Sequence, residues 1–587
     1  MEVTRLFDLL PHYAIHFPRE DALNGKENGA WRHYSIKQYI SIVNNISYGL
    51  MQLGIKKGDK IASISSGRPE WNFLDMAILQ LGAIHVPIYP TISEDNYKFI
   101  LHNAEVKMVF VSGWDILRKI ENLLSEIPKL KDNIYTFRNL RGYKHLNEVV
   151  QLGAANPSTQ YLNNIKDHIS PDDVATIIYT SGTSGTMKGV QLTHHNIISN
   201  FKAILPIVPT HAQTKVLSYL PLCHVYERMM IYAWHYLGIP IYYAESIGTI
   251  AANLNEVHPT ILTTVPRLLE KFYDRFVANG RKLPKKQKKL FFWADEVASH
   301  YEIENRSRQY NRQLKTARML VLKKFREALG GKIEVIVSGG AAIQPRLCRI
   351  FWAAEMPVLE GYGLTETSPV IAVSSFFHNG MQFGTVGQPL PGTEVKIAED
   401  GEILTRGACV TPGYYNADEL TREAIDDEGW FHTGDKGEFL PQGQLKITGR
   451  KKEIFKTAFG KYIVPTQVES KFAENSLIDN IMVVGENKKF AAALIVPNFA
   501  DLRSWCAKKG IPYTTNGEMI NHPDVLKKFK KIADQCNAQL NETERVMRFS
   551  LIGYEWSINT GELTPTLKIK RHYIAEKYAD KIEALFE

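Results

Sequence analysis

Short runs of β-branched and apolar residues alternate with longer amphipathic segments along most of this chain. The run at 60–66 is followed by an amphipathic segment at 70–82 and by another run at 106–112. Further apolar runs lie at 174–180, 215–220, 239–244, 260–265 and 333–338. Short apolar runs separated by helical segments are typical of parallel strands that are buried on both faces. The sequence therefore predicts a large α/β domain in which helices cover a parallel sheet.

The length of the chain predicts more than one domain. It has 587 residues, 44% of them hydrophobic, which is more than one hydrophobic core usually serves. From about residue 381 strands alternate with Pro-Gly and Asp-Gly turn signals, which predicts a β-rich subdomain. We expect an N-terminal domain over 1–449 with this subdomain at about 381–449, a hinge at 450–452, and a small α+β C-terminal domain over 453–587.

Cysteine usage and the apolar segments bear on where the protein works. The five cysteines are scattered and none lies in a Cys-x-x-Cys pair, which argues against a disulfide framework or a zinc site. The N-terminus has acids and a proline where a signal peptide needs an apolar core. The apolar stretch 216–243 contains Glu227, Arg228 and two histidines, so it fails as a membrane span. We expect a cytoplasmic protein, either soluble or attached peripherally to a membrane.

The formal net charge of +8 is spread unevenly. Six basic residues crowd just before the aromatic cluster 290–293: Arg281, Lys282, Lys285, Lys286, Lys288 and Lys289. Basic residues beside aromatic ones can contact anionic lipid head groups, so 281–293 is a candidate for peripheral membrane contact. The alternative is a solvated helix face whose apolar side packs on the domain. No nucleic-acid partner is expected, since no helix-turn-helix, RNP-type or zinc-finger signature accompanies the charge.

A loop rich in glycine and hydroxyl residues, 179–189, directly follows a predicted strand. Unshielded backbone amides, hydroxyls and one lysine suit it to a polyphosphate. Its candidate phosphate-binding residues are Thr180, Ser181, Gly182, Thr183, Ser184, Gly185 and Lys188. It is not a Walker loop, because Met187 stands where the second glycine would be and Gly189 follows Lys188. A flexible surface loop is the alternative, but α/β sheets bind ligands at this position after a strand.

The stretch 179–189 resembles the phosphate loop of the AMP-forming adenylating enzymes, which include acyl-CoA synthetases, luciferases and nonribosomal adenylation domains. Other stretches similar to motifs of this superfamily follow in its order: LPLCHVYER at 220–228, VSGGAAI at 337–343, EGYGLTET at 360–367, GTVGQPLPG at 384–392, GACVTPGYY at 407–415, WFHTGDKGEF at 430–439, TGRKKEIFKT at 448–457 and GELTPTLKIKR at 561–571. Chance agreement of so many ordered motifs is negligible. The chain resembles the long-chain fatty acyl-CoA synthetases most.

The resemblance implies a site for Mg-ATP. Glu366 is similar to the superfamily's magnesium-binding glutamate, with the Thr180 hydroxyl as a second hard oxygen ligand; a helix-capping acid is the alternative. Gly339, Gly340 and Ala341 are implied at the adenine edge, and Tyr362 is implied as the ring that stacks on the base. Further cofactor-binding residues are implied in the same motif: Glu360, Gly361, Gly363 and Thr365. An ordinary strand-to-helix turn and a core tyrosine are the alternatives there.

Further roles follow only from the resemblance. Asp435 resembles the carboxylate that accepts both ribose hydroxyls, and Arg450 resembles a second ribose or phosphate contact. Lys452 lies where the family has its hinge. Without the resemblance, Asp435 would be an ordinary turn residue, and Arg450 and Lys452 would belong to a basic linker. His224 resembles the residue near the carboxylate and phosphate site, although a lone histidine usually just satisfies a core hydrogen bond.

Lys568 is similar to the superfamily's C-terminal catalytic lysine, which reaches between the substrate carboxylate and the α-phosphate. A fixed ammonium there stabilises the charge that builds on five-coordinate phosphorus. Many members have Gly where Leu567 stands, and Lys570 is the alternative counterpart. The implied catalytic residues are thus Lys568, Glu366 and His224.

The implied reaction has two halves. A fatty acid carboxylate, already ionised at neutral pH, attacks the α-phosphorus of Mg-ATP and gives acyl-AMP and pyrophosphate. Rotation of the mobile C-terminal domain then brings in the loop 457–460, and the thiol of coenzyme A attacks the adenylate. Arg228 stands where some bacterial long-chain enzymes have an aromatic gate, so gating of the acyl tunnel could differ. The alternatives are a ligase that loads a carrier protein, one that activates another acid, and a non-catalytic lipid-uptake or scaffold protein.

Overall fold

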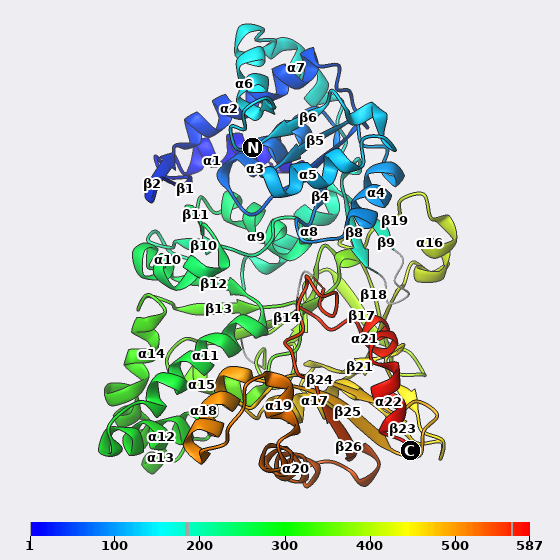
Figure 1. Cartoon of the computed structure of the whole chain (residues 1–587). Coiled ribbons are helices and arrows are strands. Elements are labelled where there is room, and N and C mark those ends of the chain that lie inside the picture. The colour runs from blue at the N-terminus through cyan, green and yellow to red at the C-terminus, as the bar shows by residue number, and fades with distance from the viewer. Residues whose placement is uncertain (1, 182–186, 378, 565–566) are drawn as a thin grey trace. The chain divides into compact units, whose positions relative to one another are not determined.

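The computed structural model describes residues 2–181, 187–377, 379–564 and 567–587 (Figure 1). The chain divides into two compact units. The large unit comprises Met1–Lys396, Leu404–His432 and Leu440–Leu445, and the small unit comprises Ile397–Ile403, Thr433–Phe439 and Lys446–Glu587. The prediction of a large α/β domain with parallel sheets and a smaller C-terminal domain is confirmed.

An eight-stranded sheet in the large unit has the order β19-β9-β8-β4-β3-β5-β6-β7. Its strands are β3 (Lys60–Ile64), β4 (Ile84–Ile88), β5 (Met108–Val111), β6 (Ile134–Thr136), β7 (Lys144–His145), β8 (Val174–Ser181), β9 (Met187–Thr193) and β19 (Gly413–Tyr414). Neighbours from β8 to β7 are parallel, as predicted. At the other edge β9 is antiparallel to β8, and β19 is antiparallel to β9.

A nine-stranded sheet in the large unit has the order β16-β15-β14-β13-β12-β10-β11-β1-β2. Its strands are β1 (Leu23–Glu27), β2 (Ala30–Tyr34), β10 (Val216–Ser218), β11 (Ile241–Tyr243), β12 (Ile261–Thr264), β13 (Val335–Ser338), β14 (Val358–Gly363), β15 (Val370–Val373) and β16 (Gln388–Pro389). Four of the predicted apolar runs thus form the adjacent parallel strands β11, β10, β12 and β13.

Helices share one hydrophobic core with strands of both sheets, among them α3 (Pro69–Gln80), α8 (His194–Ile204) and α9 (Val225–Tyr236). Every residue of α9 from Val225 to His235 is buried, which explains why the stretch 216–243 is so apolar. Across the described ranges, no helix combines the length and the apolar character needed to cross a membrane.

Two further regions complete the fold. The turn-rich region forms a four-stranded sheet of β17 (Thr393–Ile397), β18 (Glu402–Gly407), β20 (Phe431–Phe439) and β21 (Leu445–Arg450). In the small unit, the hairpin β22 (Phe455–Lys456) and β23 (Tyr462–Ile463) precedes a three-stranded sheet of β24 (Ile478–Val484), β25 (Ala491–Pro497) and β26 (Val546–Leu551). The helices α17 (Pro465–Ala473), α18 (Phe499–Lys509) and α20 (Pro523–Asn537) contribute to the core around that sheet.

Candidate active site

The predicted phosphate loop connects the antiparallel strands β8 and β9. Thr180 pairs with Lys188 and Ser181 with Met187, so the two ends of the loop lie opposite each other. The predicted residues Gly182, Thr183, Ser184 and Gly185 lie outside the described part of the chain. Strand pairing therefore fixes Thr180 and Lys188 where the loop leaves the sheet.

Lys188 and Glu366 form an ion pair in the large unit. Nζ of Lys188 lies 2.9 Å from Oε1 of Glu366, a residue of the short 3-10 helix η5 (Thr365–Thr367). The Tyr414 hydroxyl donates to the same Oε1 at 2.8 Å and accepts from Nζ of Lys188 at 2.6 Å. The Lys188 ammonium also lies 4.2 Å from the centroid of the Tyr414 ring. The structure thus brings together the lysine of the phosphate loop and the predicted metal ligand.

The surroundings of Glu366 fit a magnesium ion that arrives with a nucleotide. Hydrogen bonds hold the backbone around Glu366 in place. The backbone N–H of Thr411 donates to the Glu366 carbonyl at 2.8 Å, and the Asn200 side chain of α8 bonds both the N–H and the carbonyl of Val370. Within the described ranges, no group of three His, Cys, Asp or Glu side chains could hold a metal ion. One carboxylate and the Thr180 hydroxyl suit Mg²⁺, which takes its other ligands from phosphate and water.

The residues predicted to bind the nucleotide base and their neighbours in the motif lie where β13 and β14 end. Gly339 and Ala341 follow β13, and Gly340 between them has a φ of +83°, which favours glycine. The Ile343 backbone N–H donates to Oε1 of Glu360 at 3.1 Å and so ties β14 to this turn. Burial raises the pKa of Glu360 to about 8, although this hydrogen bond opposes the change. Glu360 therefore supports the turn as a neutral carboxyl at neutral pH.

The end of β14 leads the chain to Glu366. Gly361, the half-buried Tyr362 and Gly363 are its last three residues, and Thr365 begins η5. A Cβ on Gly363 would lie 1.7 Å from the carbonyl oxygen of Pro369, so no side chain fits there. The glycine is needed for this close backbone approach.

His224 is the N-cap of α9. Its Nδ1 accepts from the Tyr226 backbone N–H at 3.2 Å, so a neutral ring carries its proton on Nε2. The N-cap contact is the core hydrogen bond that the structural alternative for this histidine expects.

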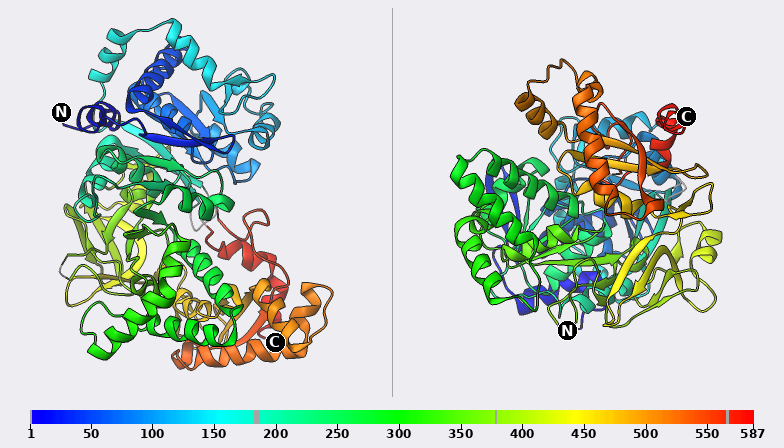
Figure 2. Two further views of the ribbon diagram at one scale, coloured as in Figure 1. Left: turned by 90° about the vertical axis from the view of Figure 1, so that its left-hand side faces the viewer. Right: turned by 90° about the horizontal axis from the view of Figure 1, so that it is seen from below.

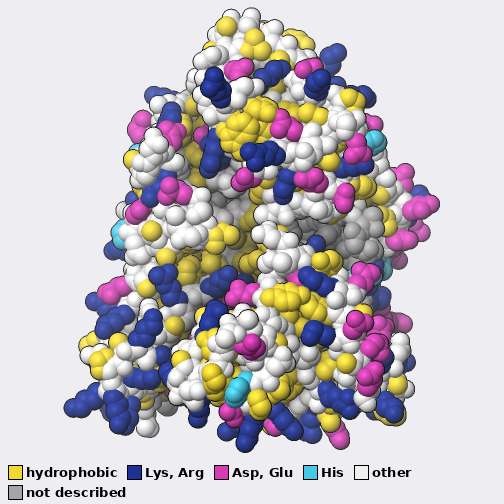
Figure 3. All heavy atoms as spheres, in the orientation of Figure 1, with side chains coloured by type: hydrophobic (Ala, Val, Ile, Leu, Met, Phe, Trp, Pro, Cys, Tyr) yellow, Lys and Arg dark blue, Asp and Glu magenta, His cyan; other side chains and the backbone are white. Residues whose placement is uncertain are grey.

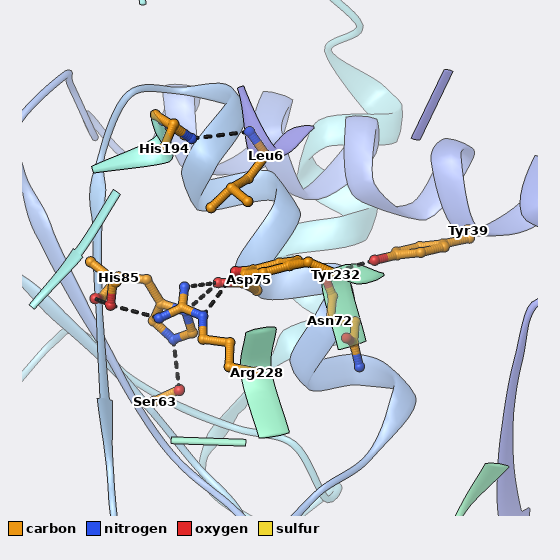
Figure 4. A network of polar contacts seen from close by, with 10 residues as sticks. Leu6, Tyr39, Ser63, Asn72, Asp75, His85, His194, Arg228 and Tyr232 are labelled. Atoms are coloured by element: carbon orange, nitrogen blue, oxygen red, sulfur yellow. Dashed lines mark hydrogen bonds and ion pairs between the residues drawn. The ribbon is translucent and has the colours of Figure 1, made fainter. Parts of the chain in front are cut away.

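Arg228, also on α9, lies in a buried polar network (Figure 4). Its guanidinium donates to Asp75 of α3 at 2.5 Å, to the Tyr232 hydroxyl at 2.8 Å and to the Thr176 hydroxyl of β8 at 2.6 Å. Burial alone would raise the pKa of Asp75, but Arg228, with hydrogen bonds from His85 and Tyr232, lowers it to about 2. Arg228, which stands at the expected gate position, is thus held in the core by these hydrogen bonds. It links α9 to the strand that enters the phosphate loop.

This network contains a Ser–His–Asp arrangement with the contacts of a serine-hydrolase triad, formed by Ser63, His85 and Asp75. The Ser63 hydroxyl lies 2.7 Å from Nε2 of His85, whose Nδ1 lies 2.6 Å from Asp75. Burial lowers the pKa of His85, so the ring is neutral. Ser63 and His85 are 0% exposed and Asp75 is 1% exposed, so no substrate reaches the hydroxyl. This Ser–His–Asp arrangement is therefore structural and not catalytic.

In the small unit Asp435 and Arg450 form an ion pair. Nε of Arg450 at the end of β21 lies 3.0 Å from Oδ1 of Asp435 in β20. The next residue, Lys451, contacts Asp400. Lys452 is exposed in the turn that follows. The two residues predicted to contact ribose are therefore adjacent.

Lys568 belongs to the same electrostatic group of the small unit. Desolvation lowers the pKa of its ammonium and the charge of Arg450 lowers it further, whereas Asp435 and Glu453 raise it. The Lys568 side chain is exposed, so solvent screens these interactions. The small unit thus places Lys568 within electrostatic reach of the predicted ribose contacts.

Sequence reasoning missed Tyr414 altogether and missed the role of Arg228 in the core. Tyr414 lies in the stretch 407–415 that resembles a family motif, but nothing there distinguishes it from Tyr415. The signal for Arg228 was an arginine inside an apolar stretch, since a buried arginine requires an acidic partner. That partner, Asp75, lies 153 residues earlier and could not be identified from spacing.

Both units match known protein families. The model described as "AMP-binding enzyme" matches residues 11–415, and that described as "AMP-binding enzyme C-terminal domain" matches 453–587. The chain is 33% identical to the long-chain-fatty-acid–CoA ligase FadD15 of Mycobacterium bovis, over 95% of this chain and 93% of that protein. It is 32% identical to the peroxisomal long chain acyl-CoA synthetase 6 of Arabidopsis thaliana, over 92% of this chain and 79% of that protein.

Solved structures share the fold. The adenylation domain of a carboxylate reductase from Mycobacterium chelonae superposes with a TM-score of 0.79 at 20% identity, covering 99% of this chain and 91% of that one. A fatty acyl CoA synthetase of Mycobacterium tuberculosis gives 0.64 at 20% identity, covering 98% and 99%.

Proposed function

Since this chain belongs to the AMP-binding enzyme family, we propose that it is an ATP-dependent long-chain fatty acid–CoA ligase. Its similarity to a ligase of that name over 95% of its length supports the choice of acid. The observation that carries the chemistry is the pairing of Lys188, at the phosphate loop, with the buried Glu366. The reaction converts a fatty acid, ATP and coenzyme A into acyl-CoA, AMP and pyrophosphate.

In the first half-reaction the fatty acid carboxylate attacks the α-phosphorus of ATP, and pyrophosphate leaves. Lys188 and the Thr180 hydroxyl bind phosphate oxygens, and Glu366 with Thr180 would hold Mg²⁺, which when bound neutralises phosphate charge. Lys568 stabilises the charge that develops at the α-phosphorus. No general base is needed, because the carboxylate is already ionised.

The nucleotide contacts follow from the same assignment. The Asp435 carboxylate accepts from the ribose hydroxyls while Arg450 keeps it oriented. Tyr362 stacks on adenine next to the turn 339–341, and His224 lies near the carboxylate and phosphate site. Each of these roles rests on the family resemblance, and Arg450, Tyr362 and His224 also lie at or next to the end of a strand or helix.

In the second half-reaction the thiol of coenzyme A attacks the acyl-adenylate and AMP leaves. We assign the hinge to Lys452, and the loop 457–460 between β22 and β23 to the thioester step. Phe459 of this loop is 72% exposed, and Gly460 has a φ of +76°, as a tight hairpin end requires. Rotation about the hinge would exchange Lys568 for this loop.

A pyrophosphate-release assay with acids of graded chain length, with and without coenzyme A, tests the proposal. We expect release with long-chain fatty acids and a thioester product when free coenzyme A is present. Release without a thioester would favour loading of a carrier protein. Release with aryl or short-chain acids would mean that one of these, and not a long-chain fatty acid, is the substrate. No release with any acid would favour a non-catalytic lipid-uptake or scaffold protein.

The large unit also has a basic surface that suits a peripheral membrane contact. The helices α11 (Pro266–Arg281), α12 (Lys285–Ser299), α13 (Arg308–Ala317) and α14 (Lys323–Ala328), with the π-helix η4 (Arg318–Leu322), pack against one another (Figure 2). Residues 281–332 contain 15 Lys and Arg but only 5 Asp and Glu, so this segment's net charge of +10 exceeds the +8 of the chain. Lys and Arg side chains gather over this region (Figure 3).

The exposed apolar residues of the basic surface are not the predicted aromatic cluster. Phe291 is buried and packs on Phe276, so that part of the cluster serves the core, as the structural alternative expected. Met319 and Leu320 of η4 are instead 67% and 40% exposed, between Lys315 and Lys323. Apolar side chains among lysines suit the head-group region of an anionic bilayer.

Neutralising Lys285, Lys286 and Lys289 with glutamine is expected to reduce co-sedimentation with phosphatidylserine vesicles at least tenfold. Each basic residue near such a surface contributes about 1 kcal/mol. The matched control replaces three exposed lysines of α20: Lys527, Lys530 and Lys531. Equal binding by both triple variants would rule out this surface as the membrane contact.

A further inference from the structure

We infer that Tyr414 is a positioning residue that holds the Lys188 ammonium and the Glu366 carboxylate at the spacing needed for Mg-ATP. The inference rests on the proposed function, because it assigns Glu366 to the metal. Tyr414 contacts both partners of the pair, and the residue is 5% exposed. It therefore acts through Lys188 and Glu366 and does not itself bind the nucleotide.

The hydrogen bonds of Tyr414 have only one consistent direction. A carboxylate can only accept and an ammonium can only donate. The single phenolic proton must therefore point to Glu366, while the phenolic oxygen accepts from Lys188. A phenol is protonated at neutral pH, so this proton stays in place.

The backbone around Tyr414 is fixed from two directions. Tyr414 pairs with Val190 of β9, two residues after Lys188, and its N–H donates to the Thr421 hydroxyl at 3.0 Å. On the other side, Thr411 bonds the Glu366 carbonyl through its N–H and the Gln191 carbonyl through its hydroxyl. The segment 411–414 therefore joins β9, which carries Lys188, to η5, which carries Glu366.

This arrangement matters when a cation binds to Glu366. The cation and the Lys188 ammonium compete for one carboxylate, so Lys188 must give up part of that contact. The face of the Tyr414 ring can keep the ammonium nearby, since cation–π contacts contribute about 0.5–2 kcal/mol. The phenolic proton meanwhile keeps Glu366 oriented, as hydrogen-bond partners of metal ligands do.

Calorimetric binding of α,β-methylene-ATP at graded Mg²⁺ concentrations tests the inference without turnover. Tyr414→Phe keeps the ring and removes the hydroxyl. We expect the half-saturating Mg²⁺ concentration to rise roughly tenfold, the usual effect of losing such a partner. Binding of the analogue in EDTA should not change. Tyr415→Phe, the same change one residue later, should leave both values at those of the unaltered protein.

A double-mutant cycle with Glu366→Gln distinguishes the role of Tyr414 from the assignment of Glu366 to the metal. If Tyr414 acts through the carboxylate, Tyr414→Phe has no further effect on the Mg²⁺ requirement in the Glu366→Gln background. A full tenfold effect there, or an unchanged requirement in the single variant, would overturn the inference. If Glu366→Gln alone leaves the Mg²⁺ requirement unchanged, the metal assignment in the proposed function fails instead.

Discussion

Replacing Lys568 with alanine is expected to slow acyl-adenylate formation roughly a thousandfold, as loss of a preorganised electrostatic contact to a transition state does. The ammonium stabilises charge only while carboxylate oxygen and pyrophosphate exchange on the α-phosphorus. Attack of coenzyme A on an adenylate that is already formed has no such charge on phosphorus. Thioester formation from supplied acyl-AMP should therefore proceed at nearly the unaltered rate.

Two assays on one preparation measure this prediction. Fatty-acid-dependent pyrophosphate release reports the first half-reaction, and acyl-CoA formed from synthetic acyl-AMP reports the second. Lys570→Ala is the matched control, since it removes the same charge two residues later and is the alternative counterpart in the family motif. If Lys570→Ala shows the large loss, the roles of the two lysines are reversed. Equal loss of both half-reactions in Lys568→Ala would refute its assignment to adenylation.

Replacing Arg228 with methionine is expected to destabilise the large unit by about 3–5 kcal/mol. The change leaves the Asp75 carboxylate buried without its counter-charge, supported only by the His85 and Tyr232 hydrogen bonds. For a unit of this size the thermal midpoint should fall by roughly 4 °C. Thermal unfolding followed by circular dichroism at neutral pH gives the measurement.

Two controls show whether the buried charge is responsible. Adding Asp75→Asn to Arg228→Met removes the uncompensated charge and should recover much of the lost stability. Arg406→Met, which breaks the exposed ion pair with Glu394, should cost no more than about 1 kcal/mol. A double variant as unstable as Arg228→Met would indicate that shape, and not charge, dominates at this position.

The strands and helices of this fold were predictable wherever burial dictates composition. The runs at 174–180 and 333–338 are apolar because neighbouring strands and helices cover both faces, and they form β8 and β13. The antiparallel pairing of β9 and β19 was not predictable. β19 has only two residues, Gly413 and Tyr414, and it takes its place through contacts with a strand far away in sequence. Such pairing leaves no local periodicity.

The candidate site was likewise predictable from the sequence only in part. Lys188 and Glu366 could be proposed because each lies in a stretch that resembles a motif, and the structure places them in contact. Their shared partner Tyr414 could not, because a tyrosine that bridges two charges has the same local sequence as one that packs in the core. Arg228 was predicted as a charge in an apolar stretch and as the residue at an expected gate position. Its role in the core could not be predicted, since its partner is determined by the contact of α9 with α3.

The pairing of β19 with β9 also affects how the chain acquires its fold during synthesis. The Thr411 hydroxyl bonds a carbonyl of β9 that lies 220 residues earlier, so most of the large unit leaves the ribosome before this edge can be covered. Until then β9 presents unpaired amides and carbonyls to any other strand nearby. A fragment that ends before Gly413 would keep that open edge permanently. Expression of the large unit as a separate piece should therefore extend beyond Tyr414 if aggregation is to be avoided.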